Sequence, residues 1–85
     1  MVAEIFPRVH AYDLIIAENK EAFVAEHVFE MLDSKEFAIK LAVNVLMKEE
    51  GEHLIRIYSN EGGYEDVYIE GIKKDPLGVF FYLDL

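Results

Sequence analysis

Apolar residues alternate along Phe37–Met47, the longest such pattern in the chain. Every odd position is apolar, and the even positions include Lys40, Asn44 and, just beyond, Lys48. Alternation of this kind is typical of a strand that is buried on one side. The pattern predicts a long strand, joined to the next one through a hairpin loop at Glu49–Gly51.

A helix of similar span is the open alternative for this stretch. It is rich in leucine, alanine and lysine, Asp33 and Glu36 have the spacing of a capping box, and Gly51 stands where a helix would end. Pairing favours the strand, because a loop at Glu49–Gly51 sets Lys48 against Glu52.

A different period runs from Asn19 to Asp33. Its apolar side recurs with helical spacing, and acidic residues occupy the rest of the turn; the apolar side consists of Phe23, Val24, His27, Val28, Met31 and Leu32. This segment predicts one amphipathic helix with Asn19 as its N-cap.

Shorter alternating runs predict further strands. Val2–Phe6, which Pro7 interrupts, is typical of an edge strand, and Val9–Ile16 reads either as a strand or as the first turns of the helix, with the strand favoured. His53–Ser59 would direct Ile55 to the core, and Asn60–Gly63 would turn the chain back.

The pairing after that turn has consequences for individual side chains. A loop of Glu61–Gly63 would place Arg56 beside Tyr68, as a cation–π pair. A further turn at Lys73–Gly78 would lead to a last strand, Val79–Leu85. Gly71 would then lie under a bulky neighbour such as Phe81.

These elements predict a single domain over residues 1–85 of the α+β class. One amphipathic helix packs on an antiparallel meander of four to five strands; the alternative is two helices followed by a three-stranded meander. The order strand, helix, four strands is similar to the cystatin-type fold. The chain contains no glutamine, so the Gln-x-Val-x-Gly loop of the cystatins is absent and the resemblance implies nothing about function.

The net charge is the most distinctive overall property of the sequence. The formal net charge is −9, which disfavours direct binding of nucleic acid and favours a basic protein partner, although such a charge also serves solubility alone. The chain has no cysteine and no apolar run of membrane-spanning length. Its start lacks the features of a secretory signal, so a cytoplasmic location is expected.

Histidines near carboxylates resemble fragments of metal or acid–base sites. They are His10 with Asp13, His27 with Glu30, and His53 after Glu49, Glu50 and Glu52. None has a full ligand set, and neither Ser34 nor Ser59 stands in a nucleophile motif. We therefore predict no cofactor, no metal and no enzymatic activity.

Tyrosines and carboxylates supply the predicted binding surface. The sheet face away from the helix would be rich in tyrosine, which suits recognition of a partner or formation of a homodimer. The predicted partner-binding residues are Glu49, Glu50, Glu52, Tyr58, Glu65, Asp66, Tyr68, Glu70 and Tyr82. The hypothesis is a non-enzymatic inhibitor or DNA mimic that binds a basic, for example nucleic-acid-binding, protein.

The alternative hypothesis is a small-ligand-binding or catalytic module. Its pocket would lie between helix and sheet around His27, with Phe23 and Met31 in its lining.

Overall fold

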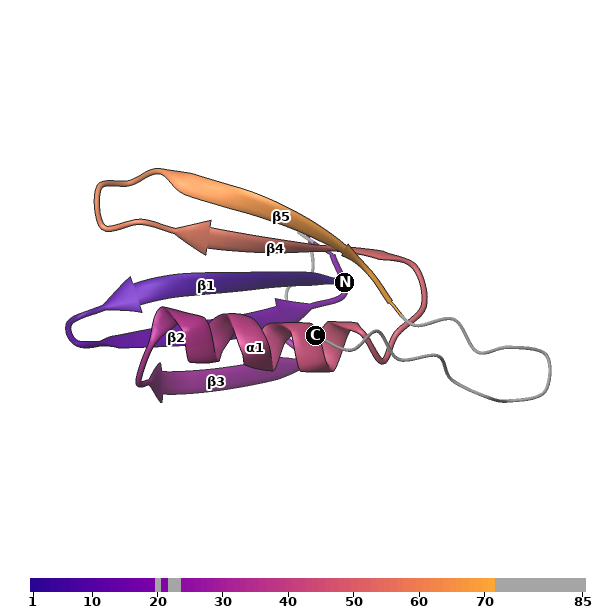
Figure 1. Cartoon of the computed structure of the whole chain (residues 1–85), viewed down its shortest axis with the longest axis horizontal. Helices are drawn as coiled ribbons and strands as arrows, with labels where there is room; N and C mark the ends of the chain where they lie inside the picture. Colours follow the sequence, from indigo (N-terminus) through magenta and orange to yellow (C-terminus); the bar gives the residue numbers. More distant parts are fainter. Residues whose placement is uncertain (20, 22–23, 72–85) are drawn as a thin grey trace.

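The computed structural model describes residues 1–19, 21 and 24–71. The elements follow the order β1 (Val2–Arg8), β2 (Ala11–Ala17), β3 (His27–Leu32), α1 (Lys35–Leu46), β4 (Glu52–Tyr58) and β5 (Tyr64–Glu70). The strands form one five-stranded sheet in the order β3-β2-β1-β4-β5, and α1 covers one of its faces (Figure 1). The predicted α+β class, with one helix on a sheet, is confirmed.

The sheet is mixed, whereas the prediction was a purely antiparallel meander. β1 pairs antiparallel with β2 on one side and parallel with β4 on the other. The parallel pair arises because α1 carries the chain from β3 across β2 and β1 to β4, as a right-handed crossover (Figure 1). The similarity to the cystatin-type fold is not confirmed.

Strand β1 lies in the middle of the sheet, so its prediction as an edge strand is wrong. Pro7 is accommodated because the pairing with β4 covers only Val2–Ile5. The Leu54 N–H donates to the Met1 carbonyl, so odd residues of β1 turn their backbone toward β4. Pro7 has no backbone N–H, and an N–H at this position would point toward β4. Pro7 lies beyond the last residue of β1 that pairs with β4, so no ladder hydrogen bond is lost.

Residues 27–32 form strand β3, so the predicted helix over 19–33 is wrong. The pairing of β3 with β2 shifts register at a bulge, where Met31 has a φ of 57° and its N–H donates to Asp13 Oδ1 at 3.0 Å. The bulge places Phe29 and Leu32 on the same side of the sheet, packed against the core. Their spacing of three residues imitates the repeat of a helix.

Helix α1 occupies the stretch predicted as the strand Phe37–Met47, which corrects that prediction in favour of its alternative. Ser34 is the N-cap, and its hydroxyl accepts a hydrogen bond from the Phe37 N–H at 3.1 Å. The chain after the helix turns through Gly51, whose φ is 102°, as a residue without a Cβ allows. No hairpin loop forms at Glu49–Gly51.

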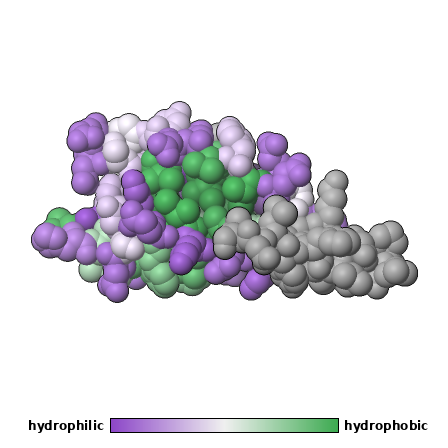
Figure 2. Space-filling model, viewed as in Figure 1, coloured by the Kyte–Doolittle hydropathy of each residue, from purple (hydrophilic) through white to green (hydrophobic). Residues whose placement is uncertain are grey.

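The core lies between α1 and the strands beneath it. The helix buries Ala38, Ala42 and Leu46, a stripe with a period of four. The alanines let the helix approach the sheet closely, and the fully buried Ile5, Leu14, Ile16 and Ile55 fill the space around them. Each such side chain contributes roughly 1.5–3 kcal/mol. Hydrophobic residues also gather where the sheet extends beyond the helix (Figure 2).

The β4–β5 hairpin has the predicted strands but a different register. Its loop is longer than predicted, so Arg56 faces Asp66 and not Tyr68. At the other end, a Cβ on Gly71 would collide with the carbonyl of Glu49, which explains a glycine there. The turn Lys73–Gly78, the strand Val79–Leu85 and the contact with Phe81 lie outside the described residues.

Candidate protein-interaction surface

Glutamates crowd one end of the sheet, where β1 and β4 begin and β2 and β5 end. Glu18, Glu26, Glu49 and Glu50 surround a hollow of about 300 Å³. Glu52 and Glu70 adjoin it as the first residue of β4 and the last of β5. We call these glutamates the acidic end. All of them are exposed, and the described ion pairs, Arg8–Asp13 and Arg56–Asp66, involve none of them.

Glu52 and Glu70 are direct cross-strand partners. Backbone hydrogen bonds join Ser59 to Gly63 at one end of the β4–β5 ladder and Gly71 to Gly51 at the other. The hydrogen-bonded pairs of this ladder are therefore the pairs of odd-numbered residues. Glu52 and Glu70 therefore form a non-hydrogen-bonded pair, the kind in which opposing side chains come closest. Two like charges directly opposite one another destabilise a hairpin.

His53 lies beneath the acidic end with only 4% of its surface exposed. Its Nε2 lies 2.8 Å from the Glu49 carbonyl oxygen, and its Nδ1 lies 3.0 Å from the Met1 ammonium. A carbonyl only accepts and an ammonium only donates, so Nε2 carries the proton and Nδ1 accepts. These bonds hold the chain before β4, and with it Glu49, against the start of β1.

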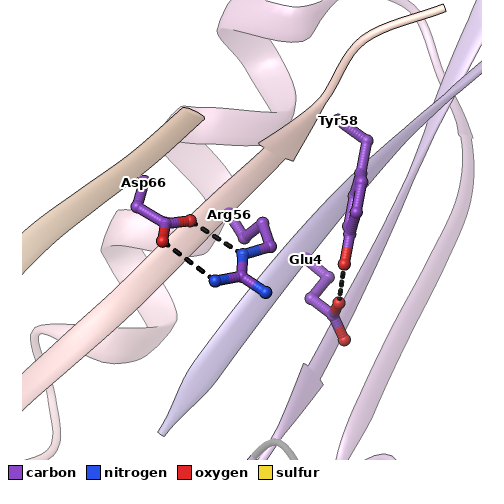
Figure 3. Close-up of polar contacts among 4 residues, drawn as sticks. All are labelled: Glu4, Arg56, Tyr58 and Asp66. Atoms are coloured by element: carbon purple, nitrogen blue, oxygen red, sulfur yellow. Dashed lines mark hydrogen bonds and ion pairs between the residues drawn. The ribbon is translucent and has the colours of Figure 1, made fainter. Parts of the chain in front are cut away.

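A second cluster occupies the open face of the sheet, the face away from α1. Arg56 Nε and Nη2 donate to the two carboxylate oxygens of Asp66 at 2.8 and 2.9 Å (Figure 3). The Arg56 guanidinium also lies 4.0 Å from the centre of the Tyr64 ring. The predicted cation–π pair of Arg56 with Tyr68 is therefore wrong; the aromatic partner of Arg56 is Tyr64.

Aromatic rings extend this cluster toward β1. Phe6 stacks on Tyr58 with ring centres 4.8 Å apart, and Tyr64 meets Tyr58 edge-on at 6.0 Å. The Tyr58 hydroxyl donates to Glu4 at 2.6 Å (Figure 3).

Two pKa values respond to these contacts. Hydrogen bonds to Asp66 raise the pKa of the Arg56 guanidinium above its ordinary value, so Arg56 remains charged and paired. The hydrogen bond to Glu4, followed by burial, raises the pKa of the Tyr58 hydroxyl, because a tyrosinate would face a carboxylate.

The predicted binding residues fall into separate groups. Glu49, Glu50, Glu52 and Glu70 gather at the acidic end, whereas Tyr58, Asp66 and Tyr68 lie on the open face. Tyr68 is 62% exposed. Glu65 pairs with Ile57 on the helix side of the sheet, and Tyr82 lies outside the described residues. Ala42 and Leu46, at even positions of the predicted strand Phe37–Met47, belong to α1 and are buried in the core.

Sequence reasoning missed several members of these clusters. Glu18 and Glu26 join the acidic end because the Glu26 N–H donates to the Ile16 carbonyl at 2.8 Å, which closes the β2–β3 connection beside Met1. Glu4 and Phe6 join the open face because β1 is central. Correct placement of β1 and β3 was needed to find them.

The pocket predicted around His27 does not form in the described part of the chain. His27 and Met31 are exposed on β3, and Phe23 lies outside the described residues. Within residues 1–19, 21 and 24–71, no group of three or more histidines and carboxylates could hold a metal ion.

A larger groove, of about 410 Å³, lies at the end of the sheet opposite the acidic end. The β4–β5 loop forms one wall with Ser59, Asn60 and Glu61. Tyr12 and Lys35 contribute the other side. The groove is polar and open, and it contains none of the predicted pocket residues.

Comparison with known proteins adds no relative. No protein-family model matches the chain, and neither a curated protein nor a solved structure matches it. None of the helices in the described residues has the length and apolar character needed to cross a membrane. The surface itself is therefore the basis for inferring a function.

Proposed function

We propose that this chain is a non-enzymatic acidic interaction protein that binds a basic protein surface through its acidic end. The observation that supports this most is the Glu52–Glu70 pair within a wider group of glutamates. Placing like charges opposite one another lowers stability. Such an arrangement is typical of a surface retained for binding, where a local rule of stability is broken for function.

Electrostatics define the partner. A concentrated negative field attracts lysine- and arginine-rich surfaces and accelerates their association. The same field repels phosphate backbones, so nucleic acid itself is a disfavoured partner. Proteins that bind nucleic acid carry basic surfaces for that purpose, and these proteins are therefore the favoured partners. An inhibitor or a DNA mimic of such a protein fits these properties, in a cytoplasmic setting.

The open face supplies anchors beside the charges. Tyr64 and Tyr68 are 57% and 62% exposed on the open face; Tyr68 lies two residues before Glu70 on β5, whereas Tyr64 lies at the other end of the strand. Exposed tyrosines provide large contact area and a polar tip, so they are frequent centres of binding energy. The glutamates would steer the partner and the tyrosines would hold it.

The small-ligand alternative ranks second. The groove beside the β4–β5 loop has a volume in the range of ligand sites, and Tyr12 and Lys35 offer it polar groups. It lacks the apolar enclosure that ligand pockets usually have.

The proposal is tested by affinity capture with matched variants. The bait is the wild-type chain, the acidic-end variant Glu49→Lys, Glu50→Lys, Glu52→Lys, or a control with Glu30→Lys, Glu36→Lys, Glu61→Lys at exposed positions elsewhere. Host lysate is applied at low salt, eluted with a salt gradient and quantified by mass spectrometry.

The expected result is one basic protein retained by the wild type and the control and lost from the acidic-end variant. Both triple variants change the net charge equally, so general charge effects cancel. Equal loss from both variants would show that net charge alone retains the partner. Equal retention by both variants would show that the acidic end takes no part in binding. Circular dichroism verifies that each bait is folded.

A further inference from the structure

The groove of about 410 Å³ lies between the start of α1 and the β4–β5 loop, at the end of the sheet opposite the acidic end. The described chain is interrupted between Asn19 and Val24 and ends at Gly71, and these positions lie at the acidic end (Figure 1). All residues that line the groove therefore belong to the described part of the chain and lie away from its breaks.

Opposite charges line the two sides of this groove. Lys35, the first residue of α1, lies on one side together with Tyr12. Glu61, in the β4–β5 loop, and Glu65, the second residue of β5, lie on the other side. All three charged residues are exposed, and none of them forms an ion pair with another described residue. The groove therefore has a positive side and a negative side.

A backbone acceptor belongs to the negative side. The even residues of β4 turn their backbone groups toward β1, as the bond from the Leu54 N–H to the Met1 carbonyl shows. The pairing of the two strands stops at Ile57, and the next donor along β1 would be Pro7, which has no N–H. The carbonyl of Tyr58, a groove residue, therefore accepts no ladder hydrogen bond from β1. A ligand that donates hydrogen bonds would satisfy this oxygen.

We infer that the groove binds a small zwitterion that carries an ammonium and a carboxylate group, as a free amino acid or a dipeptide does. The carboxylate pairs with Lys35 and accepts a hydrogen bond from the Tyr12 hydroxyl. The ammonium donates to the Tyr58 carbonyl and pairs with Glu61 and Glu65. Two glutamates disfavour a simple anion, and Lys35 disfavours a simple cation.

The size and openness of the groove agree with this class of ligand. Its volume of about 410 Å³ is that of about 14 water molecules at roughly 30 Å³ each, which leaves room for a ligand of roughly ten heavy atoms. A polar, open groove suits a ligand that is held by charges, because such a ligand does not need an apolar enclosure. The site lies away from the acidic end, so it does not depend on the proposed basic partner.

Titration of the full chain with defined probes tests the inference. The zwitterions are L-phenylalanine and alanyl-leucine, and binding is followed by backbone NMR. N-acetyl-L-phenylalanine lacks the ammonium and L-phenylalanine amide lacks the carboxylate, while both keep the aromatic ring. We expect saturable shift changes at Lys35 and at Asn60–Glu65 with a zwitterion, and binding at least about tenfold weaker for each blocked derivative.

Matched variants assign the two ends of the ligand. Lys35→Gln should weaken binding of L-phenylalanine about tenfold but leave the amide unaffected, because the amide has no carboxylate for Lys35 to hold. The double variant Glu61→Gln, Glu65→Gln should weaken L-phenylalanine but leave the N-acetyl derivative unaffected. The controls Lys40→Gln and Glu30→Gln, at exposed positions outside the groove, should bind as the wild type does.

A lack of saturable changes in the groove with both zwitterions would overturn the inference. Equal affinity for L-phenylalanine and its two blocked derivatives would also overturn it, because recognition would then depend on the ring alone. A loss of binding that is as large in the control variants would do the same. Binding of one zwitterion alone supports the inference and sets the required distance between the two charges. Each of these outcomes leaves the basic-partner proposal standing, because that proposal is tested with variants at the acidic end.

Discussion

The Glu52–Glu70 pair predicts that a single charge reversal will stabilise the protein. The two residues are direct partners in a non-hydrogen-bonded pair at the start of β4 and the end of β5. With carboxylates about 6 Å apart in water, Coulomb repulsion is about 0.7 kcal/mol at low ionic strength. Glu70→Lys replaces this repulsion with an attraction of similar size, so we expect a gain of about 1 kcal/mol.

Salt dependence provides the check on this mechanism. Unfolding in urea is measured at about 10 mM and about 1 M salt, where the screening length falls from about 30 Å to about 3 Å. The gain should shrink to a few tenths of a kcal/mol at high salt. Glu70→Gln removes only the repulsion and should give about half of the gain.

Glu30→Lys serves as the control, because Glu30 lies on β3 at the bulge, outside the direct cross-strand pairs of the β2–β3 ladder. It changes net charge by the same amount as Glu70→Lys. If Glu30→Lys stabilises the protein equally, the effect is global and the reasoning about the pair fails. A destabilised Glu70→Lys variant would also refute it.

Two further predictions concern packing and pH. Gly71→Ala forces a Cβ against the Glu49 carbonyl and should lower the free energy of unfolding by about 1–3 kcal/mol. The control Gly63→Ala meets only an ordinary contact and should change the free energy of unfolding little. Equal effects of the two variants in urea unfolding would argue against the close approach at Gly71. Tyr58→Phe should cost about 1 kcal/mol at neutral pH by removing the bond to Glu4. The folded-state pKa of Tyr58 is raised above 10, so the stabilisation by its hydrogen bond is full below pH 10 and is lost as the pH rises through the folded-state pKa. The free energies of unfolding of the wild type and the variant should therefore become equal at high pH. A difference that stays constant with pH would contradict the hydrogen bond between Tyr58 and Glu4.

The parts of the fold that depend on local pattern were predictable. The strand around Ile55, the turn after Ser59 and the strand at Ala11–Ala17 follow from alternation and turn residues. Glu49, Glu50 and Glu52, beside Gly51, were predicted to bind a partner because of their charge. Their gathering with Glu18 could not be seen, because it depends on which strands are neighbours.

Helix and strand were exchanged in the middle of the chain for two physical reasons. In α1 nearly every side is apolar, and the contact stripe consists of small residues, Ala38 and Ala42, which the strand reading placed on the polar side. In β3 the bulge at Met31 breaks the two-residue period and sets Phe29 and Leu32 three apart. The Ser34 cap was the local signal for α1.

Backbone NMR with a lysine-rich peptide is the most direct test of the acidic end. Titration at low salt maps where a basic chain binds on the folded protein. We expect the largest chemical-shift changes at the acidic end, in Glu18, Glu26, Glu49–Gly51 and Glu70. These changes should be lost in the Glu49→Lys, Glu50→Lys, Glu52→Lys variant. Changes spread evenly over all exposed carboxylates, or centred on the opposite end of the sheet, would contradict it.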